Sequence, residues 1–132
     1  MNWQVGQSLP VLVKPKITAE QLREYAQASG DRNPIHLDEA FARNAGFPSV
    51  IVHGMLCMAF MGDHVLSVFS EPQFRLEELK ARFKKVTFPG DTLTCEGEIK
   101  KIEGEGRFTL SLRSRNQAGE ITAEGEAVVR RI

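Results

Sequence analysis

Proton-handling side chains gather in one short stretch of the chain, SGDRNPIHLD, at residues 29 to 38. Asp31 offers a carboxylate, and His36 offers an imidazole five residues later. On a continuous helix, positions five apart point in directions that differ by roughly 140°. Pro34 disfavours such a helix and keeps Asn33 out of the α region. We therefore predict a turn between two helices, which can bring the carboxylate and the imidazole to one small volume.

The same residues also have purely structural uses, and the sequence leaves both interpretations open. Asn33 before Pro34 is a good helix N-cap followed by a good first helical residue. Asp31 can accept hydrogen bonds from backbone amides of the turn. His36 can be a partly buried ring that is bonded to a backbone carbonyl.

A second group with possible chemistry is His53-Gly54-Met55, at the expected start of a long apolar helix. The first amides of a helix lack internal partners and carry partial positive charge. A glycine lets a ligand approach such an amide closely, and the amide then stabilises an oxygen that gains negative charge. The alternative is that Gly54 only permits close packing and that His53 is a polar flank.

Together these residues offer an acid, a base and an amide donor, a set that suits reversible addition of water across a double bond conjugated to a carbonyl. The water loses a proton as it attacks the β-carbon, the α-carbon gains one, and the carbonyl oxygen carries the enolate charge. A carboxylate and an imidazole that share one water can manage both proton movements, because their ordinary pKa values are about 3.9 and about 6.5.

The elements that would position these groups begin with two helices. Thr18 and Gln21 form a capping-box pattern that predicts a helix through residue 28, ended by Gly30. Its inner face is expected to contain Leu22, Tyr25, Ala26 and Ser29. A second, short helix is predicted from Asp38 as N-cap to Asn44, closed by Gly46, and a first strand is expected within residues 3–14.

The rest of the chain predicts one long helix followed by strands. Residues 53–69 are apolar on nearly every side, so this helix must be buried. From Phe74 onward apolar and polar residues alternate, as in residues 93–100 and 121–129. One apolar face per strand predicts an antiparallel sheet covered on one side. The expected fold class is α+β, with a curved antiparallel sheet wrapped around one central helix.

Length and composition fit a single domain, residues 1–132, with an ordinary globular core. Seventeen basic and seventeen acidic residues give a net charge of zero, which argues against a nucleic-acid binder. Cys57 and Cys95 are too few for a disulfide framework, and we expect buried free thiols. The start shows no secretory signal, and the longest apolar run, residues 55–61, is far shorter than the ~20 residues of a membrane span. We expect a cytoplasmic protein with no membrane partner.

The run YAQASGDRNPIH, residues 25–36, continued by LDEAFARNAGFPSVIVHGM to Met55, closely resembles the MaoC-like dehydratase family, which includes the (R)-specific enoyl-CoA hydratases. The family motif is an aromatic residue, a small-residue turn, Gly-Asp-x-Asn-Pro-aliphatic-His, and an Asp two places on. This sequence matches the motif at Gly30, Asp31, Asn33, Pro34, Ile35, His36 and Asp38. The resemblance covers residues 5–130 and is sharpest across residues 25–56.

The resemblance implies a hot-dog fold, in agreement with the periodicity, and an enzyme that hydrates trans-2-enoyl-CoA to (R)-3-hydroxyacyl-CoA or runs the reverse dehydration. Asp31 and His36 would be the catalytic pair that holds the water. Asn33 and Gly54 would be substrate-binding residues: Asn33 would orient the turn or the pair, and Gly54 would offer its amide to the thioester carbonyl. No metal or redox cofactor is implied. The substrate would be carried by coenzyme A or acyl carrier protein, and the assembly would be a homodimer or a higher oligomer.

One departure from the family pattern lies in FKKVTFPGD, where Val86 and Thr87 stand at positions that relatives often fill with Pro and Val. This change bears on substrate preference. Lys84 and Lys85 either meet coenzyme A phosphates or guard a solvated strand edge. His64 is expected to be structural.

Two other functions stay open from the sequence. A thioesterase of the same fold would release free thiol. A non-catalytic subunit would bind the acyl thioester without turning it over, although silent subunits tend to lack the Asp or the His of the motif.

Overall fold

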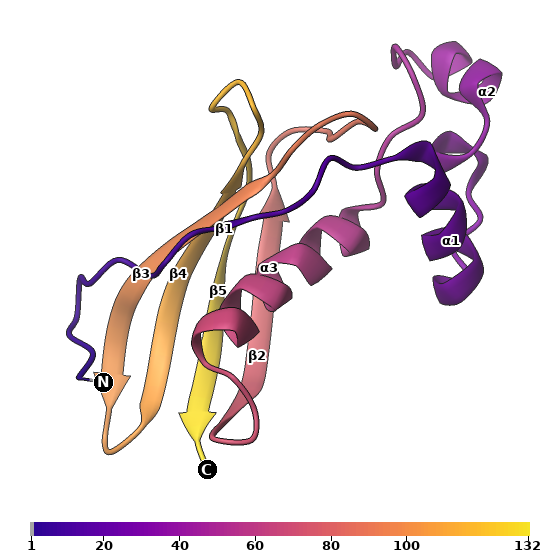
Figure 1. Cartoon of the computed structure of the whole chain (residues 1–132). Helices are drawn as coiled ribbons and strands as arrows, with labels where there is room; N and C mark the ends of the chain where they lie inside the picture. Colours follow the sequence, from indigo (N-terminus) through magenta and orange to yellow (C-terminus); the bar gives the residue numbers. More distant parts are fainter. Residues whose placement is uncertain (1) are drawn as a thin grey trace.

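The computed structural model describes residues 2–132 and shows a curved antiparallel sheet wrapped around one long helix (Figure 1). The strands are β1 (Leu12–Val13), β2 (Phe74–Phe83), β3 (Thr94–Glu103), β4 (Arg107–Arg115) and β5 (Ile121–Arg131). They form one sheet in the order β1-β3-β4-β5-β2, and the central helix is α3 (Gly54–Val68). The predicted α+β architecture is confirmed. Within residues 2–132, no helix has both the length and the apolarity that a bilayer crossing requires.

The inner face of the sheet packs on α3 through one apolar core. The helix contributes Met61 and Val65, and Phe69 follows at its end, each at most 1% exposed. The strands contribute alternate residues that are all buried: Ile99, Phe108, Leu110, Leu112, Ala123, Ala127 and Val129. Removal of this apolar surface from water stabilises the fold by about 25 cal/mol for each Å². The core therefore fixes α3, and with it the helix start at Gly54, against the sheet.

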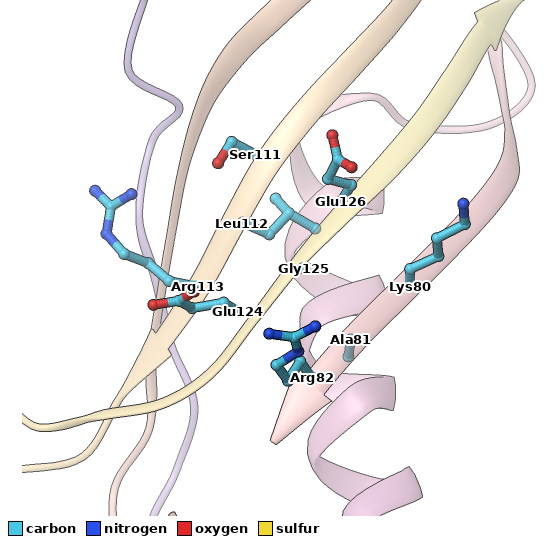
Figure 2. Close-up of a pocket in the computed structure, with 9 residues that line it drawn as sticks. All are labelled: Lys80, Ala81, Arg82, Ser111, Leu112, Arg113, Glu124, Gly125 and Glu126. Atoms are coloured by element: carbon cyan, nitrogen blue, oxygen red, sulfur yellow. The ribbon is translucent and has the colours of Figure 1, made fainter. Parts of the chain in front are cut away.

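Two glycines let neighbouring strands approach closely where the sheet curves. A Cβ on Gly125 would overlap the carbonyl oxygen of Lys80 on β2. A Cβ on Gly97 would lie 2.6 Å from the carbonyl oxygen of Ser111 on β4. Glycine in a strand interior commonly marks such close backbone approaches. Figure 2 shows the outer face of the sheet around Gly125, where side chains of β2, β4 and β5 surround a shallow concavity.

The short helices α1 (Ala19–Ser29) and α2 (Glu39–Asn44) form an overhang beyond the start of α3 (Figure 1). Thr18 Oγ1 accepts a hydrogen bond from the Gln21 amide at 3.1 Å, and Gly30 ends α1 with a φ of 82°. Asp38 Oδ1 accepts from the Phe41 amide at 3.2 Å and caps α2. These predicted caps are confirmed.

A second apolar cluster attaches this overhang to the rest of the fold. Its buried members include Ile17, Leu22, Ala42, Val50, Val52, Leu56 and Phe60. They come from α1 and the residue segment just before it, from α2, from the segment before α3 and from the first turns of α3. The segment that carries the candidate catalytic residues is therefore attached to the start of the central helix.

Three expectations were wrong in part. The predicted first strand is reduced to Leu12–Val13 plus one bridge from Ser8 to Glu98, because Pro10 has no amide hydrogen for the ladder. Ser29 is exposed rather than on the inner face of α1, because its hydroxyl accepts from the Asp31 amide where the chain turns. Helix α3 is not buried on all sides. Residues four apart along one stripe are exposed: Met55, Ala59, Asp63 and Ser67.

Candidate active site

Side-chain caps fold the chain between α1 and α2 into a turn that fixes the Asp31 carboxylate. The turn contains a short 3-10 helix, η1 (Pro34–His36). Asp31 Oδ1 accepts from the Asn33 amide at 3.3 Å, and Asn33 Oδ1 accepts from the Ile35 amide at 3.1 Å. One carboxylate oxygen of Asp31 is therefore used by the turn, while Oδ2 is left for other partners.

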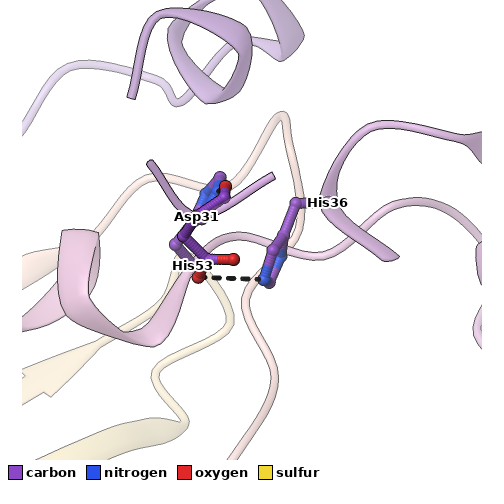
Figure 3. Close-up of side chains that lie close together, drawn as sticks. All are labelled: Asp31, His36 and His53. Carbon is purple, nitrogen blue, oxygen red and sulfur yellow. Dashed lines mark hydrogen bonds and ion pairs between the residues drawn. The ribbon is translucent and has the colours of Figure 1, made fainter. Parts of the chain in front are cut away.

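The His36 ring is held from behind by a backbone carbonyl. Its Nδ1 lies 2.8 Å from the carbonyl oxygen of Ile51. A carbonyl oxygen only accepts hydrogen bonds, so Nδ1 carries the proton and Nε2 of the neutral ring has the free lone pair. Nε2 faces Asp31 Oδ2 at 3.9 Å (Figure 3). The His36 side chain is 10% exposed and that of Asp31 is 49% exposed, so the pair lies at the boundary with solvent.

The separation of the pair decides what it can do. At 3.9 Å, Oδ2 and Nε2 are too far apart for a direct hydrogen bond. They are close enough for one water to bond to both. A carboxylate and an unprotonated imidazole nitrogen around the same water can accept and return its protons.

His53 packs directly behind the pair. Its Nε2 donates to the backbone carbonyl of Asp31 at 3.1 Å, and its ring stacks on His36 with centroids 3.9 Å apart and planes at 23°. Tyr25 of α1 makes an edge contact with the same ring at 4.8 Å. Burial of the His53 ring lowers its pKa, so the ring is neutral. The sequence assigned His53 no role beyond that of a possible polar flank, and no pattern in the chain signals this contact across 22 residues.

Asp31, His36 and His53 also bring three metal-type ligand atoms within 4.8 Å of one another. The geometry suits proton transfer better than metal coordination. One nitrogen of each ring is already bonded to a backbone carbonyl, and the two rings are stacked on each other at 23°. In addition, His53 Nδ1 is sealed from solvent.

Gly54 lies beside this group as the first residue of α3. Its N-cap, His53, makes no side-chain capping bond. Within residues 2–132, no acceptor bonds the Gly54 amide. Gly54 and His36 line the same cleft of about 310 Å³, which also includes Phe83, Lys84 and Lys85. The cleft is therefore lined by His36 of the pair and by Gly54, whose amide is free.

Cys57 lines the cleft one turn beyond Gly54. Burial raises the pKa of its thiol to about 11, so the sulfur is protonated at neutral pH and is a poor nucleophile. Cys95 is also a buried free thiol, and burial raises its pKa to about 11. Both cysteines match the sequence prediction.

A larger concavity of about 580 Å³ lies on the outer face of the sheet (Figure 2). Most of its charged side chains already have partners: Lys80 pairs with Glu78, Glu126 with Lys100, and Arg113 with Glu98. Its other two charged residues, Arg82 and Glu124, lie opposite each other on β2 and β5, and a guanidinium does not give up its proton near neutral pH. We therefore place the candidate site at the smaller cleft.

Comparison with known proteins identifies the family of this chain. A family model for a MaoC-like domain matches residues 3–120. The chain belongs to the MaoC-like family. Among relatives of this family, the (R)-specific enoyl-CoA hydratase of Aeromonas caviae is 35% identical over 131 residues, 95% of this chain and 97% of that protein. The peroxisomal multifunctional enzyme type 2 of Mus musculus is 44% identical over 69 residues, which are 52% of this chain but only 9% of the mouse protein.

Solved MaoC-like structures share the fold. The unliganded R-hydratase PhaJ1 of Pseudomonas aeruginosa has a TM-score of 0.87 and 33% identity, covering 97% of this chain and 81% of that one. The (R)-hydratase of Aeromonas caviae also has a TM-score of 0.87, with 32% identity and coverage of 98% and 97%. The hot-dog fold implied by the motif is confirmed.

The structure brings together three of the four predicted site residues: Asp31, His36 and Gly54. Asn33 lies in the same turn, but its side-chain oxygen is occupied by the Ile35 amide. Its observed role is to shape the loop rather than to face the cleft. His64 donates through Nε2 to the Pro10 carbonyl at 2.7 Å, a structural contact as expected.

Proposed function

We propose that this chain is a hydro-lyase that hydrates trans-2-enoyl-CoA to (R)-3-hydroxyacyl-CoA, or runs the reverse dehydration. The observation that carries the proposal is the separation of 3.9 Å between Asp31 Oδ2 and His36 Nε2, beside the unpartnered amide of Gly54. The similarity to (R)-specific enoyl-CoA hydratase over 95% of the chain supports the same reaction and the same hand of the product.

The proposed mechanism uses only groups of this chain and one water. The water bonds to Asp31 Oδ2 and His36 Nε2, and its oxygen attacks C3 of the enoyl group while one of its protons passes to the pair. Charge moves to the thioester oxygen, where the Gly54 amide stabilises it. The pair then returns a proton to C2, so water is added with no net gain or loss of protons. This route needs neither a metal nor a redox cofactor.

The carrier of the acyl group is proposed to be coenzyme A or acyl carrier protein, both of which present phosphate. Lys84 and Lys85 line the same cleft as His36 and supply positive charge at its edge. Lys85 pairs with Glu120, whereas in the part of the chain that the structure describes Lys84 has no acidic partner. Lys84 is therefore the better candidate for a phosphate contact.

We also propose that residues 1–132 form one MaoC-like domain and that two copies form a homodimer. Among residues 2–132, β5 is the one strand that pairs with β2, so the other edge of β2 is open. Met55 on the exposed stripe of α3 is 60% exposed, and Phe83 at the end of β2 is 46% exposed. A second copy would cover these apolar groups and narrow the open cleft. A cytoplasmic location remains part of the proposal.

Purified protein mixed with trans-2-butenoyl-CoA tests the function. Loss of the conjugated double bond, with a product that chiral chromatography identifies as the (R)-3-hydroxy thioester, is the expected result. A thiol-trapping dye in the same assay detects thioester hydrolysis, since hydration releases no thiol. Thiol release without hydration would identify a thioesterase, and binding without turnover would identify a silent subunit; either outcome rejects the proposal.

A further inference from the structure

His53 is a buried titratable residue that the proposed reaction does not use. It is 1% exposed, and its Nδ1 is a buried polar atom with no partner within residues 2–132. Leaving a buried nitrogen unpaired costs free energy that an apolar ring would avoid. Such an unpaired group calls for an explanation in its surroundings.

The surroundings of His53 are the two groups of the catalytic pair. Its Nε2 donates to the backbone carbonyl of Asp31 at 3.1 Å, which fixes the residue whose carboxylate faces the water. Its ring face lies on His36, with centroids 3.9 Å apart. Because His53 is also the N-cap of α3, it joins the turn to the element that carries the Gly54 amide.

We propose that His53 is a positioning residue that sets the separation between Asp31 Oδ2 and His36 Nε2. This inference rests on the proposed function. Other bonds also hold the pair: the Asn33 amide donates to Asp31 Oδ1, the Ile51 carbonyl accepts from His36 Nδ1, and the Asn33 carbonyl accepts from the His36 amide. Asn33 links both residues too, but it reaches His36 only through the backbone amide. His53 contacts the His36 ring itself and the Asp31 carbonyl, so it restricts the ring relative to Asp31. A misplacement of about 1 Å in such a group can cost about 100-fold in rate.

A simpler explanation is that His53 is only a core residue. Matched variants distinguish this explanation from the proposed positioning role. His53→Phe keeps the stacked ring and removes the donor to Asp31. His53→Gln removes the ring and can place an amide N–H near the position of Nε2. His64→Phe is the control, because His64 is equally buried on the same helix and also donates through Nε2 to a carbonyl. It lies ten residues beyond Gly54, roughly 15 Å along the axis.

The experiment measures kcat and KM for hydration, together with thermal stability, for the three variants and the parent protein. We expect His53→Phe to lose about 10- to 100-fold in kcat, with KM changed less than threefold, and His53→Gln to recover part of that loss. His64→Phe should keep kcat within twofold of the parent, even if its melting temperature falls by as much as that of His53→Phe. If His53→Phe keeps kcat within twofold, or if His64→Phe loses as much, the inference is wrong.

Crystal structures of the same variants make the inference testable without turnover. If the parent protein hydrates no enoyl thioester, the proposed function fails by that result alone. The positioning role is then judged by the distance from Asp31 Oδ2 to His36 Nε2. An increase of about 1 Å in His53→Phe but not in His64→Phe supports it, and an unchanged distance in both variants overturns it.

Discussion

Replacement of Gly54 by alanine should remove activity without destabilising the protein. A Cβ at this position would lie 3.3 Å from Cε2 and 3.4 Å from Cζ of Phe83. The Phe83 ring is 46% exposed, so it can move aside at small cost. Alanine is also a better helix former than glycine, by about 1 kcal/mol at most. These two effects nearly cancel, and the free energy of unfolding should change by no more than about 1 kcal/mol.

The effect on activity should be much larger. The added methyl group would project into the cleft next to the Gly54 amide and hinder approach of the thioester oxygen. Loss of one such donor commonly costs about 100- to 1000-fold in kcat, or about 2.7–4 kcal/mol. Steady-state hydration of trans-2-butenoyl-CoA should therefore show kcat/KM lowered by about 100-fold, while thermal unfolding shifts by only a few degrees.

Gly62→Ala is the matched control on the same helix. There a Cβ would make an ordinary contact with Leu79 Cδ2 at 3.5 Å, away from the cleft. This variant should be as stable as the parent or more stable, and its kcat/KM should be unchanged. If Gly54→Ala keeps activity within threefold of the parent, the thioester carbonyl does not bind at the start of α3, and that part of the mechanism is wrong.

Three further predictions concern the carrier, the buried histidines and the cleft thiol. Lys84→Glu should raise KM for a coenzyme A thioester about tenfold at low salt, with the gap closing as salt is added; an unchanged KM would remove Lys84 from the carrier site. Burial lowers the pKa of His64 as well as that of His53. Near pH 6.5 these two histidines therefore bind protons in the unfolded chain but stay neutral in the folded protein. Stability should be full above that pH and fall below it, and His64→Phe should show a smaller drop in urea midpoint between pH 7.5 and 5.5; an equal drop would contradict this linkage. Because burial raises the pKa of Cys57 to about 11, iodoacetamide at pH 7.5 should label native protein far more slowly than urea-unfolded protein, and equal rates would show that the thiol is accessible.

The local elements of the site were predictable because their causes are local. Pro34 prevents one continuous helix from running through the motif, Asn33 caps η1, and Gly30 ends α1 with a left-handed backbone conformation. The alternation after Phe74 likewise predicted the sheet and its covered face. The first strand is shorter than predicted because the prediction used only the spacing of apolar residues. Pro10 has no amide hydrogen to donate to the backbone hydrogen bonds of a sheet.

At the sequence level the structural and chemical uses of the motif were alternatives, but the structural contacts that are observed do not exclude the proposed chemistry. A carboxylate has two oxygens and an imidazole has two nitrogens. Asp31 uses Oδ1 in the turn and presents Oδ2, whereas His36 uses Nδ1 on the Ile51 carbonyl and presents Nε2. The bonds that hold these side chains therefore leave their other atoms available for chemistry.

The contacts of His53 could not be read from the sequence. Its hydrogen bond to Asp31 spans 22 residues, and its stack on His36 depends on how η1 is placed over the start of α3. The type of a residue shows which hydrogen bonds its side chain can form, but the folded structure determines which partner atoms lie within reach of that side chain. The exposed stripe of α3 was not predicted either, because the apolar composition of a helix does not show which of its sides the sheet covers.

The central claim is that Asp31 and His36 act on one shared water, and a double-mutant cycle tests it most directly. Asp31→Asn removes the charge at nearly constant shape, and His36→Asn can keep a donor to the Ile51 carbonyl while removing Nε2. Each single variant should lose about 100- to 10,000-fold in kcat for hydration. Because the two residues would work as a unit, the double variant should be no slower than the slower single variant. Losses that multiply in the double variant, or an Asp31→Asn protein that retains full activity, would contradict the account.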